Sequence, residues 1–134
     1  DPRYPCAVLD LPDRVVIQKP PGWQVDGMTL GPTGHPLSQY LRALLFSSQP
    51  SIAKDPEHEY GFLHRLDVPS SGLILAAKTY EAYFDLRLQL DVAELVRDYV
   101  VLWHGVGPFG RRDVSARIFS DKVDSDLPGI VHQR

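Results

Sequence analysis

Hydrophobic residues follow two different spacings along the chain, and each spacing predicts a different kind of element. From residue 37 to residue 45, after Pro36, apolar side chains recur every three or four positions, which is typical of one face of an α-helix. A second helix is predicted from Tyr80 to about Leu90, because Thr79 can cap its first turn and an apolar stripe follows. The polar, proline-containing segment 47–58 predicts a loop.

Short runs of β-branched, aromatic and other apolar residues predict strands. The predicted strands cover residues 14–19, 60–66, 72–77, 96–103 and 114–119. Short turns between consecutive strands favour antiparallel pairing, with the helices to one side. We therefore predict a single domain over residues 1–134, of the mixed α/β (α+β) class with a mainly antiparallel sheet. A Rossmann plan does not fit, since the glycine fingerprint GxGxxG is missing.

Composition and charge narrow the class of protein. With 134 residues, 43% of them hydrophobic, the chain can build one real core. A net charge of −3 argues against a generic basic nucleic-acid module but permits an enzyme with a local basic groove. Cys6 is the only cysteine, which excludes a disulfide within the chain. No apolar run approaches the roughly 18 residues of a membrane span, and no signal-peptide pattern is seen, so we expect a soluble intracellular protein.

The stretch HRLDVPSSG carries the strongest candidate for chemistry. Asp67 falls where a predicted strand ends and a turn begins, and Arg65 lies on the same face of an extended segment. A guanidinium beside a carboxylate keeps the carboxylate ionised, which suits a nucleophile or a base. The alternative is a structural ion pair, or an aspartate that caps the amides of Ser70 or Ser71. Spacing alone favours that structural alternative.

Other sites receive weaker support or none. The five histidines are scattered without a metal-ligand spacing, so no metal site is predicted. No serine-hydrolase elbow GxSxG and no phosphate-binding P-loop occurs. Arg97 and Tyr99 share one face of a predicted strand and could form a platform for a flat ring. An aromatic core residue beside an edge charge is the alternative.

Taken together, these motifs resemble a known family. HRLDVPSSGLILAAKT closely resembles the signature of the RluA-like family of RNA pseudouridine synthases, with Ser70 where threonine is usual. Three further segments resemble family segments in the same order: VVIQKPPGWQVDG, GHPLSQYLRALL and VRDYVVLWHGVGP. The resemblance covers roughly residues 14–108, and the joint order makes coincidence improbable.

The resemblance implies a pseudouridine synthase fold and a role for each residue of the motifs. Asp67 would be the catalytic nucleophile, Arg65 would hold the flipped nucleotide, and Tyr99 would stack on the target base. Arg97, in the place of the family's lysine, and His64 would complete the substrate-binding set. The implied partner is structured RNA, such as tRNA or rRNA, and no metal or organic cofactor is implied.

The family's later motif, Arg-Thr-His-Gln-Ile-Arg, has no counterpart in this chain. We therefore expect the chain to be the N-terminal part of a catalytic domain, with an exposed sheet edge and an incomplete pocket. Two alternatives stay open. The chain could be a non-catalytic, RNA- or protein-binding remnant of that fold, or an unrelated α/β domain with a structural Arg65–Asp67 pair.

Overall fold

The computed structural model of the chain describes residues 1–25, 36–48 and 50–102. These residues fall into a compact unit, Asp1–Asp98, and a second unit that begins at Tyr99. The predicted strand 114–119 lies outside the described residues.

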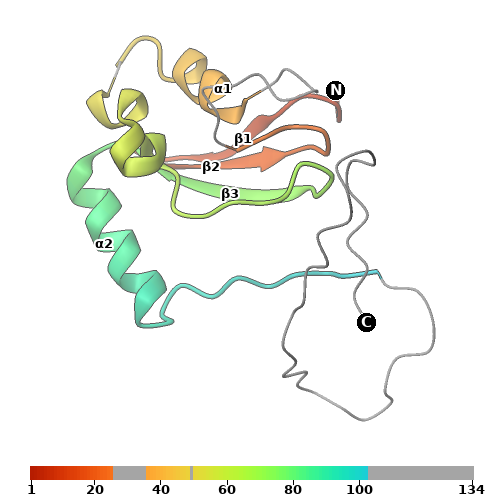
Figure 1. Cartoon of the computed structure of the whole chain (residues 1–134). Coiled ribbons are helices and arrows are strands. Elements are labelled where there is room, and N and C mark those ends of the chain that lie inside the picture. Colours follow the sequence, from red (N-terminus) through yellow and green to blue (C-terminus); the bar gives the residue numbers. More distant parts are fainter. Residues whose placement is uncertain (26–35, 49, 103–134) are drawn as a thin grey trace, which may run out of the picture. The chain divides into compact units, whose positions relative to one another are not determined.

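A three-stranded antiparallel sheet forms the centre of the first unit (Figure 1). Its strands, in spatial order, are β1 (Cys6–Asp10), β2 (Arg14–Lys19) and β3 (Gly72–Ala77). The predictions for β2 and β3 are confirmed to the residue, and so is the antiparallel pairing. β1 was not predicted: its pairing with β2 shifts register between Ala7 and Leu9, so the strand has no clean alternation to reveal it.

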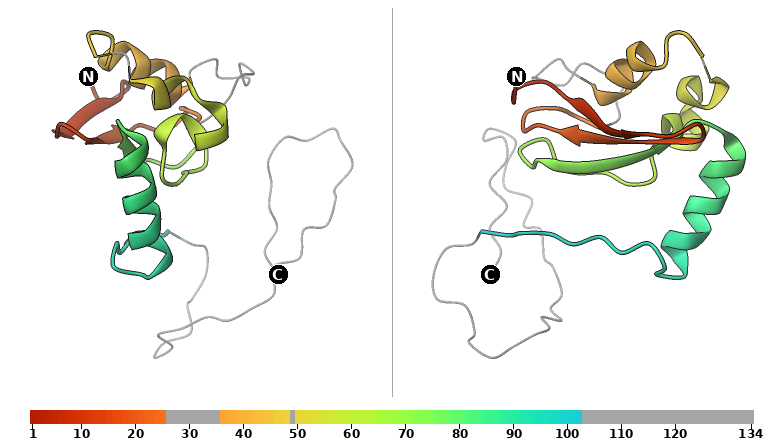
Figure 2. Two further views of the ribbon diagram at one scale, coloured as in Figure 1. Left: turned by 90° about the vertical axis from the view of Figure 1, so that its left-hand side faces the viewer. Right: turned by 180° about the vertical axis from the view of Figure 1, so that it is seen from behind.

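One face of the sheet is buried under the helix α1 (Leu37–Leu44), which confirms the first predicted helix (Figure 2). On β2 the buried positions alternate with half-buried ones, as a strand with one core face requires. Val15 and Ile17 on that face pack with Leu37 and Leu41 of the helix. Lys19 is the third buried residue of the same alternation, although its side chain is charged.

The second predicted helix is also confirmed, as α2 (Tyr80–Asp91). It begins where expected, because the Thr79 hydroxyl accepts a hydrogen bond from the Ala82 amide at 3.1 Å. The helix buries its inward residues in a second core cluster at the end of β3. That cluster consists of Ile52, Leu63, Ala77, Ala82, Tyr83 and Leu86.

The predicted strand 60–66 is wrong, and part of the predicted loop before it is helical. Two 3-10 segments, η1 (Ser51–Lys54) and η2 (Pro56–Gly61), occupy this region. Glu59 and Tyr60 have φ values of 51° and 57°, which a strand cannot contain. Only Phe62 forms a bridge to β3, opposite Ala76.

The predicted strand 96–103 is not seen as a strand either. Its described part, 96–102, pairs with no other described segment, and the Val100 and Leu102 side chains are almost fully exposed. β-branched residues favour an extended backbone, but a strand also requires a hydrogen-bonded neighbour. No helix in the described parts of the chain is long and apolar enough to cross a membrane.

Candidate active site

Asp67 lies on the connection between η2 and β3, at the start of a tight turn. The turn is closed by the backbone, since the Ser70 amide donates to the Asp67 carbonyl oxygen at 3.0 Å. The Asp67 side chain is exposed and makes no hydrogen bond or ion pair with any described residue. Its carboxylate is therefore not used to cap the turn, and it remains accessible for chemistry.

Arg65 and Asp67 are both exposed, whereas His64 and Leu66 beside them are half-buried. This alternation agrees with the expectation that the two charged side chains lie on the same side of an extended segment. The structure contains no ion pair between them, so the structural Arg65–Asp67 pair considered above is not formed. The Arg65 and Asp67 side chains of the HRLD segment are thus both exposed, and no ion pair is formed between them.

His64 faces the sheet, and its ring accepts a backbone hydrogen bond from β3 that a neighbouring strand would otherwise accept. The Leu75 amide donates to His64 Nε2 at 3.3 Å, next to the bond from the Leu63 amide to the Leu75 carbonyl oxygen at 3.0 Å. Because Nε2 accepts, the imidazole is neutral with its proton on Nδ1. Burial, and secondarily the charge of Arg97, lowers the pKa of His64, which also favours the neutral ring. The predicted role of His64 in substrate binding stays a prediction.

Stability is expected to fall on acidification because of His64. Its folded-state pKa lies below the ordinary 6.5, so below about pH 6.5 the unfolded chain binds a proton before the folded chain does. The contribution of the neutral His64 ring to the free energy of unfolding is complete above that pH. It is lost as the pH falls toward the lower, folded-state pKa. Unfolding measured at about pH 8 and about pH 5 should show a larger loss in the wild type than in a His64→Gln variant. Equal losses would contradict this assignment, because all other titrating groups are common to both proteins.

Lys19 lies within the family-like segment VVIQKPPGWQVDG, but the sequence analysis assigned it no role in the site. Its side chain is fully buried at the end of β2, and its ammonium group lies among backbone carbonyl oxygens 48 to 51 residues away. The Nζ atom donates to the carbonyl oxygens of Asp67 (3.1 Å), Val68 (3.3 Å), Ser70 (2.5 Å) and its neighbour Pro20 (3.3 Å). Burial lowers the pKa of Lys19, and the nearby Asp67 charge partly opposes that change. The sequence signal for Lys19 was its place in the family-like segment VVIQKPPGWQVDG.

A second contact joins the segment that follows β2 to the turn that carries Asp67. The Gly22 amide, three residues after Lys19, donates to the Val68 carbonyl oxygen at 2.7 Å. Next to these contacts is a hollow of about 470 Å³, with Pro20, Pro21 and Ser71 among its lining residues. The segments KPPG and DVPSS, far apart in sequence, therefore form one structural unit that carries the Asp67 carboxylate.

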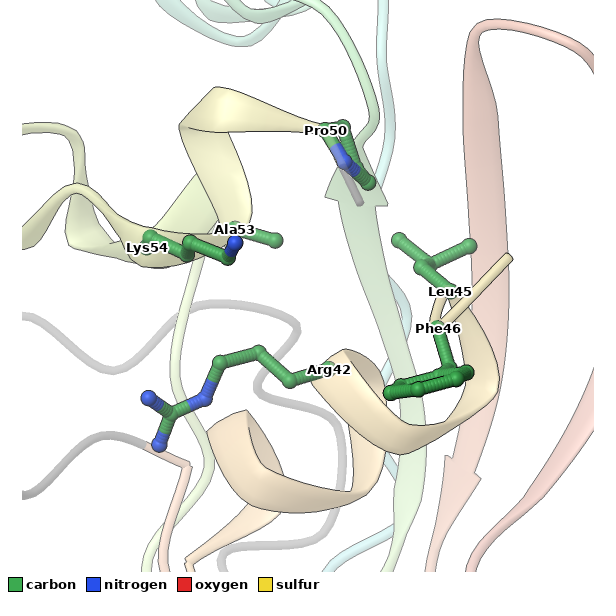
Figure 3. Close-up of a pocket in the computed structure, with 6 residues that line it drawn as sticks. All are labelled: Arg42, Leu45, Phe46, Pro50, Ala53 and Lys54. Carbon is green, nitrogen blue, oxygen red and sulfur yellow. The ribbon is translucent and has the colours of Figure 1, made fainter. Parts of the chain in front are cut away.

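A separate pocket of about 220 Å³ lies between the end of α1 and η1 (Figure 3). Its floor is apolar, and the Arg42 and Lys54 side chains border it together with the exposed ring of Phe46. None of the predicted site residues lines this pocket. It is therefore not the site that carries Asp67.

The remaining predicted site residues lie on the chain after α2. Arg97, at the end of the first unit, is exposed and near enough to His64 to affect its pKa. Tyr99 belongs to the second unit and has 58% of its surface exposed. Within the described parts of the chain, no group of three or more His, Cys, Asp or Glu side chains is placed to hold a metal ion.

Comparison with known proteins agrees with the motifs of this site. The family described as RNA pseudouridylate synthase matches residues 13–127. The chain is 34% identical to the ribosomal large subunit pseudouridine synthase D of Pseudomonas aeruginosa over 128 residues, which are 90% of this chain and 38% of that protein. It is also 34% identical to the protein of the same name from Nitrosomonas europaea, over 97% of this chain and 38% of the relative.

The chain thus spans a little over a third of the length of these relatives. The family match, residues 13–127, includes the HRLD turn, the strands β2 and β3, and the helices α1 and α2. The resemblance to RluA-like enzymes is confirmed, and the chain belongs to the RNA pseudouridylate synthase family.

Proposed function

We propose that the complete gene product converts uridine to pseudouridine in structured RNA, with Asp67 as the nucleophile. The observation that carries this proposal is the exposed Asp67 carboxylate, held on a turn of the family's HRLD segment and unpaired with other described side chains. Both relatives are named for the large ribosomal subunit. Large-subunit rRNA is therefore the first substrate class to test.

The reaction is an isomerisation, and its atoms balance without an added group. The bond from uracil N1 to the ribose C1′ breaks, a bond from C5 to C1′ forms, and the hydrogen of C5 leaves while N1 gains a proton. In our proposal the Asp67 carboxylate bonds transiently to the uridine and is released when the uracil reattaches. Because nothing is oxidised, reduced or transferred to a second molecule, the reaction consumes no cofactor.

The target base must leave the RNA stack before it can react. We assign the exposed guanidinium of Arg65, two residues from Asp67, to the flipped nucleotide and its phosphates. Tyr99 is assigned to stacking on the uracil ring, for which an aromatic face is suited. Arg97 adds positive charge near His64 in the same region, so it supports RNA binding there.

Tritium release tests the proposed function. Large-subunit rRNA transcripts that carry [5-³H]uridine should lose tritium to water when incubated with the complete gene product. Transcripts labelled at C6 should keep it, because the C6 hydrogen is retained in pseudouridine. Absence of release from C5-labelled rRNA, tRNA and bulk cellular RNA alike would reject the function and favour a non-catalytic RNA-binding role.

A further inference from the structure

The hollow of about 470 Å³ described above lies at the end of the sheet where the loop of Asp67 leads into β3. Cys6 and Gln18, which are paired across β1 and β2, contribute to its lining, and so does Ser71, directly before β3. The N-terminal segment forms a further wall. Ligand pockets usually have volumes of about 300–1,000 Å³, so this hollow is large enough for a nucleotide base.

Hydrogen bonds connect the walls of the hollow to the turn of the candidate nucleophile. The indole N–H of Trp23 donates to the Arg3 carbonyl oxygen at 3.1 Å, which holds the N-terminal segment against the segment after β2. The amide of Gly22, the residue before Trp23, donates to the Val68 carbonyl oxygen at 2.7 Å. The wall that carries Tyr4 is therefore joined, through two adjacent residues, to the turn beside it.

Three polar side chains that line the hollow make no hydrogen bond with any described residue. Gln18 is half-buried, so its free amide group is the most unusual of the three. The hydroxyl groups of Ser71 and Tyr4 are exposed, and 63% of the surface of Tyr4 is accessible. No lysine or arginine is among the described residues that line the hollow. These groups therefore suit an uncharged flat ring better than a phosphate.

We propose that the hollow binds the base of a nucleotide next to the target uridine, and that Gln18 makes adenine the preferred base there. This inference rests on the proposed function, because it places the target uridine at Asp67. Proteins read single-stranded RNA through bases that have left the stack, by aromatic stacking and by hydrogen bonds to the base edges. Tyr4 provides the stacking face, and the Gln18 amide provides the hydrogen-bonding groups.

The chemistry of the two side chains gives them different roles. A glutamine amide carries a donor and an acceptor side by side, and these match the acceptor N7 and the donor N6 of adenine. Because Gln18 is half-buried, a base that does not match leaves its polar atoms without partners, which weakens binding. Stacking on Tyr4 strengthens the binding of every base, since all four bases have an aromatic face.

Binding of short RNAs to the complete gene product tests the inference. Each RNA has about nine nucleotides and one central uridine, and the neighbour on its 5′ or its 3′ side is A, G, C or U. The parent protein for these measurements carries Asp67→Asn, so that the uridine is not converted. Fluorescence anisotropy gives the dissociation constants. We expect adenine on one side of the uridine to bind about 10-fold more tightly than the other bases.

Substitutions of Gln18 should change the choice of base. Gln18→Leu removes the donor and the acceptor, so the preference for adenine should disappear. Gln18→Glu keeps only acceptors and should favour cytosine, whose N4 amino group is a donor. Gln39→Leu is the matched control, because this exposed glutamine of α1 does not line the hollow. It should leave the adenine preference unchanged.

Substitutions of Tyr4 should change the affinity but not the choice of base. Tyr4→Ala removes the stacking face and should weaken the binding of all the RNAs by about 10-fold. Tyr4→Phe keeps the ring and should bind within about twofold of the parent protein. Phe84→Ala, at an exposed aromatic residue of α2 that does not line the hollow, is the control and should not alter the affinity.

Three results would overturn the inference. The first is equal affinity of the parent protein for all four bases on both sides of the uridine. The second is an adenine preference that persists in Gln18→Leu, and the third is unchanged affinity in Tyr4→Ala. If a variant does not fold, the base preference of the parent protein decides alone.

Failure of this inference can be told apart from failure of the proposed function. If the wild type releases tritium from rRNA but no base is preferred in the binding measurements, the function stands and the base site is rejected. If the wild type releases no tritium from any RNA, the function fails. The anisotropy measurements then still decide whether Gln18 selects adenine.

Discussion

Replacement of Asp67 by asparagine is expected to abolish pseudouridine formation, with a loss of at least about 1,000-fold in kcat. Asparagine has nearly the same shape as aspartate but carries no negative charge, and its amide is a poor nucleophile. The measurement is tritium release from C5-labelled rRNA under single-turnover conditions, which excludes effects of product release.

The fold should be insensitive to the same change. The Asp67 side chain is exposed and has no hydrogen bond or ion pair among the described residues, so its replacement should alter the free energy of unfolding by no more than about 0.5 kcal/mol. Asp91→Asn, at the exposed end of α2, is the matched control and should keep full activity. Turnover by Asp67→Asn within about tenfold of the wild type would show that Asp67 is not the nucleophile.

The largest effect on stability is expected at Gly61, where η2 passes the end of β3. A Cβ atom at this position would lie 2.5 Å from the Ala77 carbonyl oxygen, and the backbone has a φ of 88°. The chain cannot move away easily, because Phe62 bridges Ala76 and the Leu63 amide bonds to Leu75. Steric overlap and backbone strain together should make Gly61→Ala less stable by about 3–5 kcal/mol.

Gly22→Ala separates the two contributions to this loss. Gly22 has nearly the same backbone conformation, with a φ of 86°, but a Cβ there would meet nothing within 4 Å. Its substitution should therefore cost only the strain, about 1 kcal/mol, in urea unfolding of the same protein. Equal losses for the two variants would mean that the close approach to Ala77 does not determine the stability.

Among the elements of the described residues, helices α1 and α2 and strands β2 and β3 could be predicted because their signals are local. The apolar face of α1, the cap at Thr79 and the β-branched run of β2 each depend on residues within one or two turns of chain. The candidate nucleophile was also accessible from sequence, because the residues of HRLDVPSSG are contiguous and specific to a family. Comparison with known proteins confirmed that family over most of the chain.

The errors arose where a distant segment determines the conformation. The run from Tyr60 to Leu66 has the composition of a strand, but positive φ values before Phe62 reduce its pairing with β3 to one bridge. The His64 ring makes part of the remaining pairing, because its Nε2 atom accepts a hydrogen bond from the Leu75 amide. A side chain that takes the place of a backbone acceptor leaves no periodic pattern in the sequence.

The sequence by itself determined the family, the helices α1 and α2, the strands β2 and β3, and the segment that carries Asp67. Only the tertiary structure decided what surrounds that segment: the missing Arg65–Asp67 ion pair, the inward-facing His64, and the Lys19 ammonium group beneath the turn. The physical reason lies in the range of each interaction. Hydrophobic periodicity is set by near neighbours, whereas Lys19 bonds to carbonyl oxygens up to 51 residues away, and these come into reach only when β2 and β3 pair.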